Sequence, residues 1–110
     1  SRRRAKGIAL QAEHGTVFVS ARSISDLVCS LEDEFPGIEV AKVNLYNRRH
    51  ETYLETHLEY QPSDGANLPS LLNEFQKKTL STLATSFGIN SIREVRIRID
   101  RVYSPESAAH

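Results

Sequence analysis

The most constraining feature of the sequence is a pattern that occurs twice, in which a helical stretch is stopped by glycine and followed by an alternating strand. The first copy ends at Phe35, Pro36 and Gly37, and the second ends at Phe87 and Gly88. Glycine suits this position because it readily adopts the left-handed conformation that ends many helices. Apolar residues occupy alternate positions in the strands that follow, namely Val43, Leu45, Val95, Ile97 and Ile99. The repeat predicts an α+β domain.

The two helices differ in how strongly the sequence predicts them. The first has apolar residues spaced i, i+3, i+4, i+7 and i+11, which form one stripe on a helix; they are Ile24, Leu27, Val28, Leu31 and Phe35. Ser20 or Ser23 can cap its start. The second begins near Asn67, has Pro69 in its first turn, and ends at Gly88. Both are long enough to cover a sheet.

The order of elements predicts the fold class. Strands are expected at about residues 16–20, 38–46, 53–60 and 94–100, giving a βαββαβ order and a two-layer α+β sandwich. Right-handed crossovers would place both helices on one face of a four-stranded sheet. Residues 8–12 can add an extra N-terminal strand by forming a hairpin with 16–20. The domain is expected to span residues 8–103, with a disordered tail over 104–110.

Charge is unevenly distributed along the 110 residues, although the formal net charge is zero. Arg2, Arg3, Arg4 and Lys6 put four positive charges into the first six residues, so the remainder carries the compensating negative charge. This balance disfavours a globally basic nucleic-acid binder. The chain has no methionine, even at position 1, and we expect that it is excised from a longer protein. Its single cysteine, Cys29, favours a reducing compartment.

The pattern resembles the bacterial alkaline shock protein family over about residues 15–102. The likeness is carried by five segments: the strand 16–20 before Ile24 and Leu27, residues 35–38 before 43–45, the strand 54–58, the helix start 67–69, and Gly88 before 95–102. It is strongest to the soluble domain of the membrane-anchored members. The chain departs from the family at residues 47–50, where relatives often carry glycine.

The resemblance implies a non-catalytic scaffold, without a cofactor, that recruits or assembles related domains, or copies of itself, at the cell envelope during stress. Residues 1–7 would then form a basic juxtamembrane-like tail in which Arg2, Arg3, Arg4 and Lys6 lie close to an anionic membrane surface. Basic residues beside a membrane span are typical of a cytoplasmic flank. The intact protein is expected at the cytoplasmic face of the membrane, and the fragment alone is expected to be soluble.

Partner-binding residues are expected among the outward-facing side chains, which are Phe18, Tyr53, Glu55, His57, Arg96 and Arg98. His57 lies between Glu55 and Glu59 on one strand face, but no second His or Cys has a convincing ligand spacing, so no metal site is expected. The chain has no glycine-rich phosphate loop and no paired nucleophile and base, which argues against an enzyme. Cys29 beside the first helix stripe is interpreted as a packing residue.

RNA binding is the alternative function, since RNA-recognition domains share this element order and stack bases on the aromatic side chains of an open sheet face. Phe18 would serve that purpose on the first strand. The third strand, however, lacks the basic residue and glycine of such domains, and it carries Glu51 and Glu55 instead. Nucleic acid is therefore the less favoured partner.

The acidic run Glu32, Asp33 and Glu34 lies at the end of the first helix, where the helix dipole disfavours anions. We interpret it as a solvated face. A second hypothesis is a patch for Arg96 and Arg98 of another copy.

Overall fold

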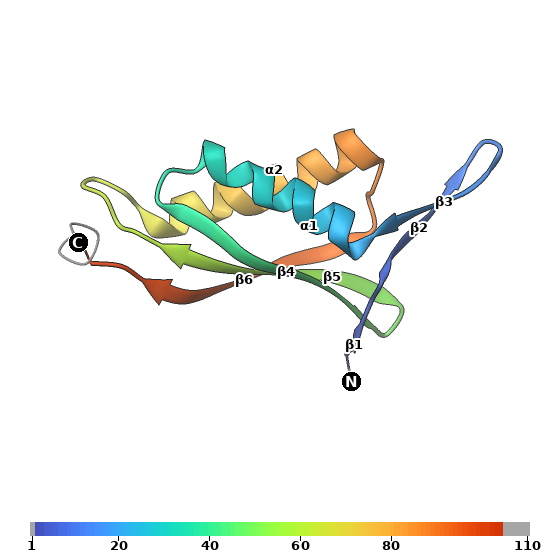
Figure 1. Cartoon of the computed structure of the whole chain (residues 1–110), viewed down its shortest axis with the longest axis horizontal. Helices are drawn as coiled ribbons and strands as arrows, with labels where there is room; N and C mark the ends of the chain where they lie inside the picture. The colour runs from blue at the N-terminus through green and yellow to red at the C-terminus, as the bar shows by residue number, and fades with distance from the viewer. Residues whose placement is uncertain (1, 105–110) are drawn as a thin grey trace.

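Both helices lie on one face of a four-stranded sheet, so the predicted α+β class is confirmed (Figure 1). The computed structural model describes residues 2–104. Its elements in chain order are β1 (Arg3–Arg4), β2 (Gly7–Ala12), β3 (Gly15–Ser20), α1 (Ala21–Ser30), the 3₁₀ helix η1 (Leu31–Glu34), β4 (Ile38–Arg48), β5 (Glu51–Tyr60), α2 (Leu68–Phe87) and β6 (Ile92–Val102).

The main sheet has the order β1-β4-β5-β6. The central strands β4 and β5 form an antiparallel hairpin whose turn is Arg49 and His50. The strands β5 and β6 are parallel, with Leu54 beside Val95 and Leu58 beside Ile99. A parallel pair needs a crossover, and α2 provides it across the covered face of the sheet.

The fourth strand of this sheet is not the one that the sequence predicts. Residues 16–20 lie in β3, which pairs only with β2 in a separate two-stranded sheet that projects from the body of the domain (Figure 1). The edge position beside β4 is taken by β1 instead, with Arg3 opposite Asn47. Ala5 anchors this segment, because it is buried and its N–H donates to the Leu45 carbonyl at 2.9 Å.

The N-terminal basic residues are therefore part of the fold, in contrast to the separate tail predicted for residues 1–7. β1 pairs with β4, and β2 begins at Gly7 directly after Lys6. Two residues of strand are too short for a sequence pattern to reveal. The tail predicted over 104–110 lies, apart from Ser104, outside the described residues.

Local signals fix three of the four helix ends as predicted, whereas α1 ends at Ser30, before the predicted stop at Pro36 and Gly37, and η1 continues to Glu34. The Ser20 hydroxyl accepts from the Ser23 N–H at 3.1 Å, and the Asn67 side chain accepts from the Ser70 N–H at 3.0 Å. Gly88 ends α2 in the left-handed conformation, with φ of 70°. The core between helices and sheet contains the fully buried Ile24, Val28, Leu54, Leu58, Phe75 and Leu83. Leu54, Thr56, Leu58 and Tyr60 face this core, as their alternation predicts.

The acidic run after α1 has partners within the domain. A Glu32 carboxylate oxygen accepts from the Val40 N–H at 2.8 Å and so satisfies the start of β4. Glu34 lies 3.5 Å from the Lys78 ammonium on α2. These contacts give two of the three carboxylates partners within the domain, so the run does not need a second copy to explain it.

Candidate functional site

The face of the sheet that the helices leave uncovered gathers most of the predicted partner-binding residues. Successive strand residues point to opposite faces, so Tyr53, Glu55 and His57 of β5 share the outer face. The parallel register places Arg96 beside Glu55 and Arg98 beside His57. Five of the six predicted residues therefore form one surface across β5 and β6.

His57 lies between two carboxylates at the centre of this surface. Its Nδ1 is 2.7 Å from an Asp100 oxygen, and its Nε2 is 3.0 Å from a Glu55 oxygen. A ring that is protonated at both nitrogens can donate to both carboxylates, whereas a neutral ring can donate to only one. The side chains of His57 and Glu55 are only 12% and 8% exposed, so water supplies little of their hydrogen bonding.

Arg2 completes the network from the N-terminal end of the chain. Its guanidinium donates to the other Glu55 carboxylate oxygen at 2.9 Å and lies 4.0 Å from the centre of the Tyr46 ring. Burial raises the pKa of the Glu55 carboxyl, but hydrogen bonds from Arg2 and His57 outweigh burial and bring this pKa below its ordinary value. Glu55 is thus held as a carboxylate at neutral pH.

Arg96 and Tyr53 pair beside this network. The Arg96 guanidinium donates to the Glu94 carboxylate and lies 4.7 Å from the centre of the Tyr53 ring. The Tyr53 hydroxyl donates to Glu51 at 3.0 Å, and this hydrogen bond raises the pKa of Tyr53. Both tyrosines of the outer face, Tyr46 and Tyr53, are therefore covered by an arginine.

Phe18 lies apart from the other predicted residues because β3 is outside the main sheet. It is 60% exposed on the projecting β2–β3 hairpin, and its neighbour Val17 is 50% exposed. A Cβ atom added to Gly7 would stand 2.6 Å from the Phe18 ring, so the ring packs directly over the Gly7 backbone. The hairpin thus exposes two apolar side chains along β3, and they are separate from the charged sheet face.

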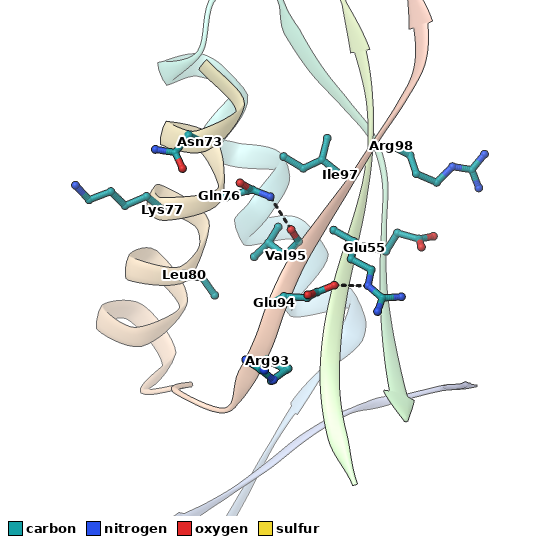
Figure 2. Close-up of a pocket in the computed structure, with 11 residues that line it drawn as sticks. Glu55, Asn73, Gln76, Lys77, Leu80, Arg93, Glu94, Val95, Ile97 and Arg98 are labelled. Atoms are coloured by element: carbon teal, nitrogen blue, oxygen red, sulfur yellow. Dashed lines mark hydrogen bonds and ion pairs between the residues drawn. The ribbon is translucent and has the colours of Figure 1, made fainter. Parts of the chain in front are cut away.

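A groove runs between α2 and the edge strand β6 (Figure 2). It has a volume of about 920 Å³. Asn73, Gln76, Lys77 and Leu80 line it from the helix, and Val95 and Ile97 line it from the strand. The Gln76 side chain donates to the Val95 carbonyl at 2.9 Å across this groove. The helix therefore satisfies one backbone group of the strand edge.

The described residues contain no group of three or more His, Cys, Asp or Glu that could hold a metal ion. Cys29 is half-buried and packs against the core, as predicted for a packing residue. Between residues 2 and 104, no helix has the length and apolar character needed to cross a membrane.

Sequence reasoning missed the residues that complete the sheet-face network. Asp100 is predicted to face outward on the fourth strand, but its pairing with His57 depends on the register of a parallel strand pair. Arg2 is predicted to face lipid, and its contact with Glu55 depends on a fold-back that no periodic pattern indicates. The one available signal was that two carboxylates flank a histidine on β5, which requires cations nearby.

Comparison with known proteins gives no sequence match and one distant structural match. No protein-family model matches the chain, and no curated protein matches it. A solved structure of a triply substituted MamM CTD superposes with a TM-score of 0.44 and 8% sequence identity, covering 76% of this chain and 93% of that chain.

Proposed function

We propose that this chain is a non-catalytic interaction domain of an alkaline-shock-type membrane-anchored protein. In this proposal it recruits or assembles related domains at the cytoplasmic face of the cell envelope during stress. The proposal is supported by the residue pattern over about residues 15–102. The observation that carries it is the projecting β2–β3 hairpin, where β3 exposes Val17 on one face and Phe18 on the other. Large apolar side chains left exposed on a projecting element mark a protein interaction site.

The outer sheet face supports the same proposal in a different way. Its arginines and carboxylates pair with one another, as Arg2 with Glu55 and Arg96 with Glu94. A surface of mixed and matched charge gives specificity to a protein contact more than it gives affinity. The hairpin would then supply apolar contact area, and the sheet face would select the partner.

The test uses two hairpin variants and one control variant of the purified chain. Self-association is measured by analytical ultracentrifugation, and binding of a purified related domain is measured by calorimetry. Val17→Ser and Phe18→Ala are each expected to weaken association about ten-fold, since a buried interface anchor contributes more than about 1 kcal/mol. Val102→Ser is the matched control, because Val102 is an equally exposed valine, at 59%, on β6.

An unchanged association constant in both hairpin variants would contradict the proposal, as would an equal loss in Val102→Ser. Because the Phe18 ring covers Gly7, thermal melting must show that Phe18→Ala is still folded; Val17→Ser does not remove that packing.

RNA binding remains the alternative, but the geometry gives it little support. Phe18 lies off the sheet face, and the two tyrosines on that face lie under arginines rather than open for base stacking. Fluorescence anisotropy with single-stranded RNA at physiological salt is expected to stay flat. Micromolar, salt-dependent binding that is lost in Phe18→Ala would favour RNA binding instead.

A further inference from the structure

Basic side chains from two distant parts of the chain meet at one end of the sheet. β1 pairs with the last part of β4, so Arg3 lies opposite Asn47. The adjoining turn adds Arg48, Arg49 and His50, and these residues with Thr52 line a depression of about 630 Å³. We call this depression the basic cup. The N-terminal end of the chain emerges beside it (Figure 1).

Apart from Arg2, which also lines it and pairs with Glu55, the basic cup holds positive charge without matching negative charge. None of the described residues that line it is acidic. Within residues 2–104, the side chains of Arg3, Arg48, Arg49 and His50 make no ion pair or hydrogen bond, in contrast to the arginines of β6. There, Arg93, Arg96 and Arg98 each lie beside a carboxylate. The cup is therefore the part of the sheet where cationic groups remain available to an external anion.

The backbone of the turn gives a second, independent indication. Arg49 and His50 have φ of 53° and 66°, in the left-handed region. A two-residue hairpin turn with both φ values positive strongly favours Asn-Gly, and other residues are costly there by about 1–2 kcal/mol each. Strained backbone of this kind is typical of functional positions. Two bulky side chains, one of them an arginine, are thus held where a smaller pair would be more stable.

We propose that the basic cup binds the phosphate groups of anionic phospholipids and sets the β4–β5 turn against the membrane surface. The inference rests on the membrane-proximal part of the proposed function and extends it from residues 2–6 to the turn. Anionic lipid attracts each arginine near its surface by about 1 kcal/mol and requires no aromatic platform. No Phe, Tyr or Trp is among the described residues that line the cup, which favours lipid over single-stranded nucleic acid, whose bases stack mainly on such side chains.

The orientation follows from the shape of the domain. The β2–β3 hairpin projects from the body on the helix side of the sheet, whereas the β4–β5 turn lies beyond the opposite side (Figure 1). Contact at the turn would therefore leave the exposed Val17 and Phe18 free for a protein partner.

The experiment measures binding of the full chain to vesicles of phosphatidylcholine containing 40% phosphatidylglycerol, by co-sedimentation at 50 mM salt. The variant Arg48→Gln with Arg49→Gln is expected to bind about 30-fold more weakly, which corresponds to two arginines at about 1 kcal/mol each. The matched control Arg93→Gln with Arg101→Gln removes the same charge from β6 and is expected to bind like the unmodified chain. Arg48→Lys with Arg49→Lys keeps the charge and is expected to retain binding.

Three results would overturn the inference. These are no binding of the unmodified chain to the anionic vesicles, an equal loss in the β6 control, and competition by millimolar inorganic phosphate that matches the lipid. The last result would assign the cup to a small phosphate ligand. A different measurement tests the proposed function. Its failure would appear as unchanged protein association in Val17→Ser and Phe18→Ala, independently of the result with vesicles.

Discussion

At the scale of single residues, Glu55 is the group on which the outer sheet face depends. It is a buried carboxylate with partners on both oxygens, Arg2 on one and His57 on the other. A buried charge that loses one of these partners is left without compensation, which is strongly destabilising. The contacts of Glu55 with Arg2 and His57 therefore contribute to the stability of the sheet.

The lowered pKa of Glu55 predicts how stability changes with pH. In the unfolded chain the carboxyl binds a proton near its ordinary pKa of 4.5, whereas the folded protein binds it only at lower pH. The contribution of the Glu55 carboxylate to the free energy of unfolding is thus fully present above about pH 5. It is lost as the pH falls through the pKa that Glu55 has in the folded protein. Glu55→Gln is expected to flatten this part of the profile, measured by urea unfolding between pH 3 and 7.

Glu59→Gln is the control for that measurement. Glu59 is the next outward carboxylate on β5, and it accepts a hydrogen bond from Tyr103. Parallel pH profiles for Glu55→Gln and the unmodified chain would show that Glu55 does not carry the acid dependence.

At the scale of elements, the native side chains of the β4–β5 turn are predicted to make the domain less stable than an Asn-Gly turn would. Replacing Arg49 by Asn and His50 by Gly supplies the pair that suits two positive φ values. The free energy of unfolding is expected to rise by about 1 kcal/mol, because the relief of left-handed strain exceeds the entropy that glycine adds to the unfolded chain. Urea denaturation measures the change.

His50→Ala provides the comparison, since it removes the imidazole but leaves a non-glycine residue at positive φ. It is expected to leave stability within about 0.5 kcal/mol, as for most surface substitutions. A loss of stability in the Asn-Gly variant would show that the native side chains stabilise the turn.

The elements that the sequence predicts are those with local signals. Ser20, Asn67 and Gly88 mark helix ends through hydrogen bonds or φ values that depend on near neighbours. The face of each residue in β5 follows from alternation alone. β1 could not be predicted in this way, because it is two residues long and its pairing with Asn47 and Tyr46 joins distant parts of the chain. The prediction that β3 belongs to the main sheet is wrong because a strand pattern does not specify which strand it pairs with.

At the scale of the whole molecule, the N-terminal segment is predicted to be structural as well as cationic. Deleting residues 1–6 removes β1, the buried Ala5 and the Arg2 partner of Glu55. The free energy of unfolding is expected to fall by at least about 1–3 kcal/mol, the cost of leaving a buried polar group unsatisfied. Thermal melting monitored by circular dichroism would detect this loss.

Arg3→Gln separates charge from fold, because it preserves the backbone pairing of β1 and leaves the hydrogen bond from Arg4 to the buried Asn44 in place. This variant is expected to melt within a few degrees of the unmodified chain. A deletion that melted at the same temperature as the unmodified chain would contradict a structural role for the segment.

The sequence predicts which residues form the candidate site, but it does not predict the contacts that they make with residues from distant parts of the chain. Tyr53, Glu55, His57, Arg96 and Arg98 share a face because of strand periodicity, which is local. Their contacts with Arg2 and Asp100 depend on how strands from the two ends of the described chain enter the sheet, with β6 beside β5 and β1 beyond β4. The basic cup could not be predicted from the sequence either, because Arg3 and Arg48 become neighbours only when β1 pairs with β4.

The network on β5 has a consequence for the lifetime of the protein. Arg2 comes from one end of the described chain and Asp100 from the other, and both reach the adjacent outward residues Glu55 and His57. Proteolytic cleavage just after Arg2, or just before Asp100, would separate a partner from the same central pair. Damage at either edge of the domain is therefore transmitted to the middle of the sheet, and a cleaved chain would open more readily to further proteolysis.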